Sequence, residues 1–316
     1  MKTKKIILSL FIFTSLVSSI FAERRSFPDN AFQSIPDSCY AVCPEEGVVF
    51  RYVYEVKNRV SSIDSKIYKK TALVYLPYGF DENDTETEYN VMYLMHGHEQ
   101  SPEFFFDGVN CNSLLKKIID SQIYEKKLAK TIFCAVTFWE PYSADVFSNA
   151  QVFNQELRED LMPLFEEKYH IRQNRNARGF GGFSMGSMTT WTIFENCLDL
   201  ISHYAPISGD ARRMGGNSSK DQGKDVGQIL SEKVISQGYT KDDFMIYSGC
   251  GANEMATPFL VPQMDKMKSH PDVFVFADNY ANGNCYFELC PKSGHDISTV
   301  LTVLYNGLPK FFPGTN

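Results

Sequence analysis

The chain has 316 residues, of which 43% are hydrophobic, and a net charge of −7 at pH 7. An acidic chain without runs of basic residues is a poor candidate for binding nucleic acid or anionic membranes. Its length is enough for one large α/β domain with a well-buried core, and no repeat or low-complexity tract divides it. We therefore expect a single folded domain.

The N-terminal segment has the features of a secretory signal peptide. Three lysines within the first five residues precede a mostly apolar stretch, and the segment ends at Ala22, a small residue of the kind that signal peptidase requires. The apolar stretch is too short and too interrupted by serine to favour a membrane span, and a buried N-terminal helix is the alternative. We expect residues 1–22 to be a signal peptide, 23–45 an irregular lead-in and 46–316 the main folded domain of a secreted protein. Cleavage would lower the net charge from −7 to −10.

The first predicted elements are two antiparallel strands, at residues 48–60 and 70–76, which would form one edge of a sheet. An acidic loop follows at 81–88. The short apolar run at 89–95 has the composition of a buried central strand.

Beyond residue 95, predicted helices and strands alternate. Helices are expected at 111–124, 154–169, 187–196, 226–237, 258–269 and 297–311, and strands at 131–138, 177–183, 202–208, 244–248 and 286–289. Alternation at this spacing indicates right-handed crossovers and a mostly parallel sheet covered by helices on both faces. The predicted fold class is therefore α/β.

The strongest local motif is the pentapeptide Gly-Phe-Ser-Met-Gly at residues 182–186. A G-x-S-x-G sequence between a strand and a helix is typical of the nucleophile elbow of the α/β-hydrolase fold, where the serine is strained and bulky residues two positions away would clash. A predicted strand precedes Ser184 and a predicted helix follows it. This setting favours Ser184 as a nucleophile over the alternative, a glycine turn with only a structural role.

The general base should follow the serine, because the α/β-hydrolase fold has the chain order serine, acid, histidine. Three histidines follow Ser184. His203 lies within a predicted strand, and His270 ends a helix before a proline, where a solvated side chain is expected. His295 lies in the loop between the last strand and the last helix, where an imidazole can reach the serine hydroxyl. We expect His295 to be the base.

The acid should follow the strand that precedes the strand of the histidine. Glu254 is the first carboxylate after the strand predicted at 244–248, and it could accept a hydrogen bond from Nδ1 of His295. Asp210 and Asp278 are alternatives, since each lies close to the end or start of a predicted strand. A surface position for Glu254 also remains open, because glutamates are mostly exposed.

The tetrahedral intermediate of an ester requires amide donors for its oxyanion. The backbone N–H of Met185, the residue after the nucleophile, is one expected donor. The loop after the strand at 89–95 should supply the other, and we expect it to be the N–H of His98. His96 and His98 also suggest a metal pair, but the sequence offers no third ligand nearby, so no metal is expected.

Aromatic residues follow the predicted strand ends at the catalytic edge and could hold an aromatic ring by stacking. They are Phe104, Phe105, Phe106, Trp139 and Tyr142. Trp139 is the one that we expect to form a wall of the substrate pocket, and ordinary core packing is the alternative for all of them.

Several longer motifs follow one another between residues 70 and 312. They are HGHEQ after YNVMYL, GGFSMGSMTTW, NCLDLISHYAPISGD, GANE, and GHD before a helix that ends in LPKFF. In this order they resemble carbohydrate esterase family 1, specifically its feruloyl esterase branch. The resemblance implies an α/β-hydrolase fold and release of hydroxycinnamic acids, chiefly ferulate, from arabinoxylan. It implies no cofactor.

The resemblance also implies site residues. The serine of the family falls on Ser184, its histidine on His295 and its acid on Glu254, although the family usually has aspartate at that turn. His98 is a second departure, because small or apolar residues are commoner there. An acetyl xylan esterase on the same scaffold is the alternative enzyme, and a catalytically inactive secreted carbohydrate-binding protein is the alternative of another class.

Eight cysteines follow residue 22, an even number that favours disulfides in an oxidising compartment. Their spacing includes no C-x-x-C pair typical of zinc sites. Cys250 and Cys290 each follow a predicted core strand, and these two strands should be neighbours about 4.8 Å apart. We therefore expect a disulfide between Cys250 and Cys290.

Overall fold

A computed structural model of the chain describes residues 33–59, 66–109, 112–141, 144–211, 224–276 and 282–315. The predicted signal peptide lies outside the described residues, as do Tyr142, Asp278 and one of the eight cysteines, Cys111. Within the predicted lead-in, residues Asp37–Tyr40 form a short 3-10 turn.

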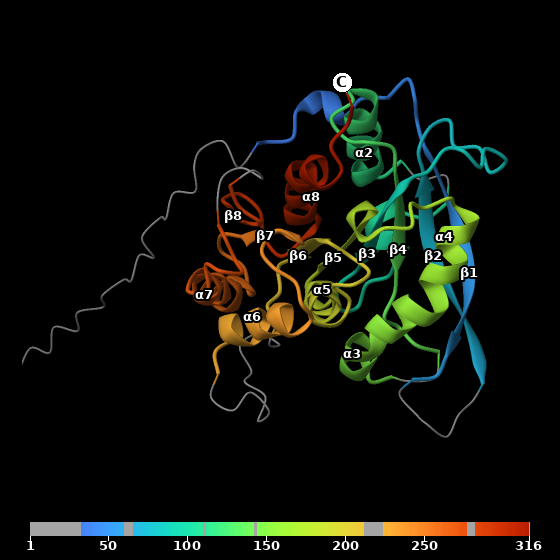
Figure 1. Ribbon diagram of the computed structural model, residues 1–316. Helices are drawn as coiled ribbons and strands as arrows, with labels where there is room; N and C mark the ends of the chain where they lie inside the picture. The colour runs from blue at the N-terminus through green and yellow to red at the C-terminus, as the bar shows by residue number, and fades with distance from the viewer. Residues whose placement is uncertain are drawn as a thin grey trace, which may run out of the picture.

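The described residues form an eight-stranded sheet in the order β1-β2-β4-β3-β5-β6-β7-β8 (Figure 1). The strands are β1 (Val48–Lys57), β2 (Ile67–Leu76), β3 (Asn90–Met95), β4 (Thr131–Val136), β5 (Arg178–Phe183), β6 (His203–Ile207), β7 (Met245–Gly251) and β8 (Cys285–Cys290). β1 and β2 are antiparallel, β2 is antiparallel to β4, and all pairs from β4 to β8 are parallel. The carboxyl ends of six strands therefore meet at one edge, where the sites of open α/β sheets lie. The mostly parallel sheet with an antiparallel edge is confirmed.

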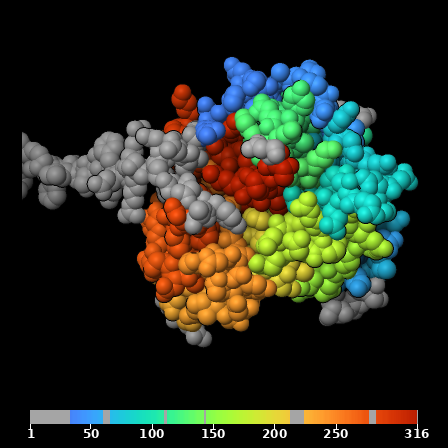
Figure 2. Space-filling view, turned by 45° about the horizontal axis from the view of Figure 1, so that its top comes forward, coloured from blue at the N-terminus to red at the C-terminus, as the bar shows by residue number. Residues whose placement is uncertain are grey.

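Helices cover both faces of the sheet (Figure 1). On one side lie α2 (Leu114–Tyr124) and α8 (Ile297–Phe311); on the other lie α3 (Val146–Glu156), α4 (Met162–Lys168), α5 (Met185–Asn196), α6 (Val226–Ser236) and α7 (Thr257–Lys268). Each layer encloses its own apolar core against the sheet. Figure 2 shows the face with the red segment of α8 at its centre, bordered by the green segment of α2. Among the described residues, no helix combines the length and the apolar character needed to cross a bilayer.

The central strands are apolar because both of their faces are covered. Every residue of β3, β4 and β5 is buried, which agrees with the continuous apolar runs expected of parallel strands inside an α/β fold. This rigid centre carries the loops that follow β3, β4 and β5 at the carboxyl edge.

The helix expected at residues 154–169 begins earlier and is interrupted. α3 starts at Val146, a π-helical turn follows at Leu157–Leu161, and α4 continues to Lys168. Two acids on this segment face inward: Glu156 accepts a hydrogen bond from Tyr54, and Asp160 accepts one from the backbone N–H of Lys57. Buried acids weaken the apolar periodicity from which a helix is predicted. The short helix α1 (Glu103–Phe106) was not expected either.

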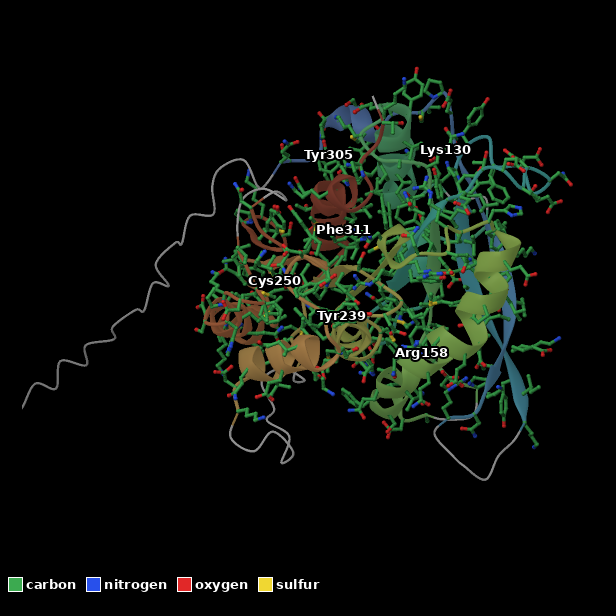
Figure 3. The ribbon with its side chains drawn as sticks, viewed as in Figure 1. Lys130, Arg158, Tyr239, Cys250, Tyr305 and Phe311 are labelled. Carbon is green, nitrogen blue, oxygen red and sulfur yellow. The ribbon has the colours of Figure 1, made fainter. Side chains whose placement is uncertain are left out.

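The expected disulfide between Cys250 and Cys290 is wrong. Both side chains are free thiols, and Cys250 contacts the hydroxyl of Thr257 on α7. In the parallel register of β7 and β8, Cys250 pairs with Leu289 and Gly251 pairs with Cys290. The two cysteines are thus one position out of register and point to opposite faces of the sheet. Figure 3 labels Cys250 on the α7 side, whereas Cys290 belongs to the core under α8.

Candidate active site

Ser184 stands at the sharp turn between β5 and α5, at the carboxyl edge of the sheet. Its backbone has φ 57° and ψ −114°, a strained conformation for a residue with a side chain. The turn is possible because its flanking residues are glycines. A Cβ on Gly182 would lie 2.4 Å from the carbonyl carbon of Gly186, and one on Gly186 would lie 2.0 Å from the carbonyl oxygen of Met95. The geometry is that of a nucleophile elbow.

His295 and Glu254 complete a hydrogen-bonded chain that ends on Ser184. Nε2 of His295 lies 2.9 Å from Oγ of Ser184, and Nδ1 lies 2.5 Å from Oε2 of Glu254. The three residues come from the loops after β5, β7 and β8, up to 111 positions apart in sequence. This is the arrangement in which an imidazole takes the proton of a serine hydroxyl while a carboxylate fixes its tautomer.

The carboxylate of Glu254 is buried and fully engaged. Its side chain is 1% exposed, whereas that of His295 is 24% exposed. Its second oxygen accepts hydrogen bonds from the hydroxyl of Ser208 at 2.7 Å and from the backbone N–H of Gly251 at 2.9 Å. These donors hold the carboxylate toward the imidazole. The longer side chain of glutamate therefore reaches His295 without loss of contact.

The other histidines after Ser184 lie elsewhere. His203 is buried in β6 beside the rings of Phe311 and Phe312, and burial lowers its pKa to about 4. His270 lies at the end of α7, 4.0 Å from Asp225. Asp210, the described alternative acid, is buried just after β6. The structure thus brings only His295 to Ser184 among these histidines.

The two backbone amides predicted as oxyanion donors belong to Met185 and His98. Met185 is the first residue of α5, so its N–H lies in the turn that has no partner within the helix and carries the positive end of the helix dipole. In the loop after β3, the N–H of Gly97 donates to Oε1 of Gln100 at 2.9 Å. A Cβ on Gly97 would come within 3.2 Å of Cβ of Ser184, so this loop lies directly against the nucleophile. The next amide along the loop is that of His98.

His96 has hydrogen-bond partners at both of its ring nitrogens. Its ring is fully buried, with Nδ1 2.7 Å from the carbonyl of Gly97 and Nε2 2.7 Å from the hydroxyl of Thr137. Burial lowers its pKa to about 4. Because both nitrogens already have partners, neither is available as a ligand in this conformation.

The predicted aromatic candidates fall into two groups. Phe105 and Phe106 are buried core residues, and half-buried Phe104 stacks on Phe183 at a centroid distance of 5.3 Å. Trp139 is half-buried, and its indole Nε1 donates to the carbonyl of Gln100 at 2.6 Å. Its ring lies 6.0 Å from that of His98, and it forms one wall of a cleft of about 380 Å³.

Two residues of the site were missed in the sequence. Ser208 holds the acid, and Gln100 joins the His98 loop to Trp139. Both are polar residues that follow parallel core strands, the position where functional side chains of α/β sheets gather. Their position after the end of a core strand is the sequence feature that could have identified both residues.

Known proteins similar to this chain are esterases and a xylanase. A serine-to-alanine variant of the feruloyl esterase module from Clostridium thermocellum, solved in complex with sinapinate, is 30% identical with a TM-score of 0.74, over 90% of this chain and 95% of that chain. The ferulic acid esterase of Anaeromyces mucronatus, solved without substrate, is 19% identical, covers 89% of this chain and 98% of its own, and shares the fold with a TM-score of 0.64. No model of a protein family matches the chain.

Endo-1,4-beta-xylanase Y of Acetivibrio thermocellus is 32% identical over 291 residues. The match covers 89% of this chain but only 24% of the xylanase, so the chain spans about a quarter of that relative. The chain has the α/β-hydrolase fold and is similar to serine carboxylesterases. It belongs to carbohydrate esterase family 1, in its feruloyl esterase branch.

Proposed function

We propose that this protein is a secreted feruloyl esterase that releases ferulate from arabinoxylan through an acyl-enzyme on Ser184. The observation that carries the proposal is the hydrogen-bonded chain from Glu254 through His295 to Ser184. The protein that contains these residues is 30% identical to a feruloyl esterase module that was solved in complex with sinapinate.

In the first half of the reaction, Oγ of Ser184 attacks the ester carbonyl carbon and its proton passes to Nε2 of His295. The carbonyl oxygen becomes an oxyanion, which accepts hydrogen bonds from the N–H groups of Met185 and His98. Glu254 stabilises the imidazolium that forms. When the intermediate collapses, the bond to the sugar oxygen breaks and His295 returns the proton to that oxygen, so the alcohol leaves and the acyl group remains on Ser184.

In the second half, water replaces the alcohol. His295 takes a proton from the water, whose oxygen attacks the acyl-enzyme, and the same two amides hold the new oxyanion. Collapse breaks the bond to Oγ, and His295 gives the proton back to Ser184. The carboxylic acid leaves and the enzyme is regenerated without a metal or cofactor.

The comparisons and the aromatic ring of Trp139 favour an aromatic acyl group in the substrate. The sinapinate in the complex of the 30% identical module is a hydroxycinnamate. Trp139 offers a half-buried aromatic wall close to the His98 loop, and such a wall suits an aromatic acyl group better than acetate. Hydroxycinnamate esters are therefore favoured over acetylated xylan.

Secretion is part of the proposal and rests on the sequence of residues 1–22. The same division gives residues 23–45 as the lead-in and 46–316 as the catalytic domain. If the segment is cleaved as proposed, the secreted protein begins at Glu23, which N-terminal sequencing can check. Retention of residues 1–22 on the secreted protein would contradict it.

A hydrolysis panel tests the function itself. Methyl ferulate, methyl sinapate and acetylated xylan would be compared at equal enzyme concentration, with release of acid measured by chromatography. We expect kcat/KM to be highest for the hydroxycinnamate esters. Faster release of acetate than of either aromatic acid would identify an acetyl xylan esterase, and no hydrolysis of any ester would favour an inactive carbohydrate-binding protein.

A further inference from the structure

A second polar surface lies at the same edge of the sheet as Ser184, at the ends of β4 and β2. The cleft of about 380 Å³ is bordered by β1 and β2, by the turn before α1 and by the segment after β4. Its size is within the range of about 300–1,000 Å³ typical of ligand sites. The lining side chains used below are those of Arg51, Thr71, Ser101, Glu103, Thr137 and Trp139.

Trp139 connects this cleft to the active site. Its indole N–H donates to the carbonyl of Gln100, whose side chain holds the N–H of Gly97 beside Ser184. The ring of His98 lies 6.0 Å from the ring of Trp139. A substrate that extends from the ester carbon past His98 would therefore meet Trp139 and then the cleft.

The charges at the cleft balance one another. Arg51 forms an ion pair with Glu103 at 3.1 Å, and both side chains are partly exposed, at 53% and 39%. Lys69 lies opposite Glu55 in the register of β1 and β2. Because these cations have acidic neighbours, the cleft does not favour an anion. It offers both donors and acceptors beside an aromatic ring, which suits a neutral ligand rich in hydroxyl groups.

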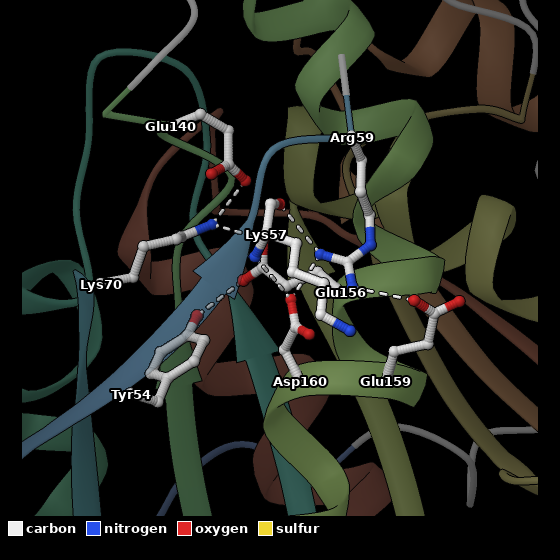
Figure 4. Close-up of polar contacts among 8 residues, drawn as sticks. All are labelled: Tyr54, Lys57, Arg59, Lys70, Glu140, Glu156, Glu159 and Asp160. Carbon is white, nitrogen blue, oxygen red and sulfur yellow. Dashed lines mark hydrogen bonds and ion pairs between the residues drawn. The ribbon is translucent and has the colours of Figure 1, made fainter. Parts of the chain in front are cut away.

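The floor of the cleft is a buried ionic network (Figure 4). Nζ of Lys70 bonds to Glu140 at 2.7 Å and to Glu156 at 2.8 Å, and Tyr54 donates to Glu156 at 2.7 Å. The side chains of the three ionic residues are at most 2% exposed. The network ties β1 and β2 to α3 and to the residue that follows Trp139. Such support keeps a binding wall in one position before the ligand arrives.

We propose that this cleft binds the neutral sugar residues on the alcohol side of the ester, with Trp139 at the border between this sugar subsite and the acyl group. The proposal rests on the proposed esterase function and adds to it a carbohydrate subsite built from the β1–β2 edge. It predicts that the enzyme distinguishes an ester of an oligosaccharide from a methyl ester by contacts at Arg51 and Thr71.

The test compares two substrates on two cleft variants. Arg51→Ala removes an exposed donor, and Thr71→Phe narrows the cleft with a residue that strands accept. kcat/KM would be measured on methyl ferulate and on a feruloylated arabinosyl xylotriose. For Arg51→Ala we expect about a tenfold loss on the oligosaccharide ester, the effect of one hydrogen bond to a charged group. For Thr71→Phe we expect at least as large a loss, and for both a change of less than about twofold on methyl ferulate.

Arg158→Ala is the matched control. Arg158 forms a similar partly exposed ion pair, with Asp199 at 2.6 Å, and Figure 3 labels it on the α3 side, outside the cleft lining. It should change neither rate. If the cleft variants lose equally on both substrates, the cleft serves the acyl group or the stability of the fold. If their rates on the oligosaccharide ester are unchanged, the cleft binds no sugar. Either result overturns the proposal.

A binding measurement separates this proposal from the esterase function. The chain has two tryptophans, and Trp191 is 1% exposed, so a fluorescence change on adding unesterified arabinosyl xylotriose would report on Trp139. Saturable binding that Thr71→Phe abolishes supports the subsite even if no hydroxycinnamate ester is hydrolysed. A flat titration of the wild-type protein counts against it even if methyl ferulate is a good substrate.

Discussion

Glu254→Gln removes one negative charge from the candidate site and keeps the length of the side chain. In the wild type the carboxylate is 1% exposed and lies 2.5 Å from Nδ1 of His295. A neutral amide there no longer stabilises the imidazolium and can present its own N–H to Nδ1, which favours the wrong tautomer. We expect kcat to fall about 10⁴-fold, equivalent to about 5 kcal/mol of transition-state stabilisation. KM should change little, because Glu254 contacts the imidazole rather than the ester.

Glu254→Asp separates the effect of charge from that of reach. Removing one methylene draws the carboxylate back by about 1.5 Å, so the contact of 2.5 Å would open to about 4 Å unless the loop moves. A carboxylate at that distance still attracts the imidazolium but no longer makes a hydrogen bond. We expect a loss of about 10²-fold in kcat, between those of the wild type and Glu254→Gln.

The assay is the initial rate of methyl ferulate hydrolysis over a range of concentrations, with thermal unfolding measured in parallel to confirm folding. Asp210→Asn is the control, because Asp210 is another buried carboxylate that follows a parallel strand. It should retain a rate within about tenfold of the wild type. If Glu254→Gln runs near the wild-type rate while Asp210→Asn is crippled, Glu254 is not the catalytic acid.

Three further predictions concern stability and covalent structure. Burial raises the pKa of Glu288 from 4.5 to about 7, so the wild-type protein loses stability relative to Glu288→Gln as pH rises through that range. Between pH 4.5 and 8, the free energy of unfolding in urea should shift in favour of Glu288→Gln by up to about 3 kcal/mol. Equal pH slopes of the two proteins would refute this. Lys70→Met leaves two buried glutamates without their cation and should lower the free energy of unfolding by about 3–5 kcal/mol, whereas Lys241→Met, at an exposed pair, should cost under about 0.5 kcal/mol. Non-reducing peptide mapping should find no bond between Cys250 and Cys290; a peptide joined through them would show that the strand register is wrong.

The features that the sequence predicted well are those with local causes. The elbow needs glycines two residues to either side of Ser184, because any Cβ there would overlap backbone atoms. The glycine requirement is therefore visible within a segment of five residues. The position of His295, in a loop between the last strand and the last helix, is also local, and strand–helix alternation then fixes the edge of the sheet on which the loop lies.

The features that were missed depend on register and on distant contacts. Cys250 and Cys290 face opposite ways because of a shift of one residue between β7 and β8, which no local pattern shows. Ser208 reaches Glu254 across 46 positions of sequence. The buried acids of the α3–α4 segment have their partners on β1 and β2, so no pattern within the segment itself predicts their burial.

Trapping the acyl-enzyme is the most direct test of the central claim. The full-length protein would be mixed with methyl ferulate, quenched with acid within the first turnover, digested and analysed by mass spectrometry, beside Ser184→Ala treated in the same way. We predict a feruloyl group on the peptide that contains residues 182–186, at Ser184, no such adduct in the variant, and a fall in kcat of about 10⁶-fold with unchanged thermal stability. A feruloyl group on another residue, or turnover by Ser184→Ala above about a hundredth of the wild-type rate, would contradict the claim.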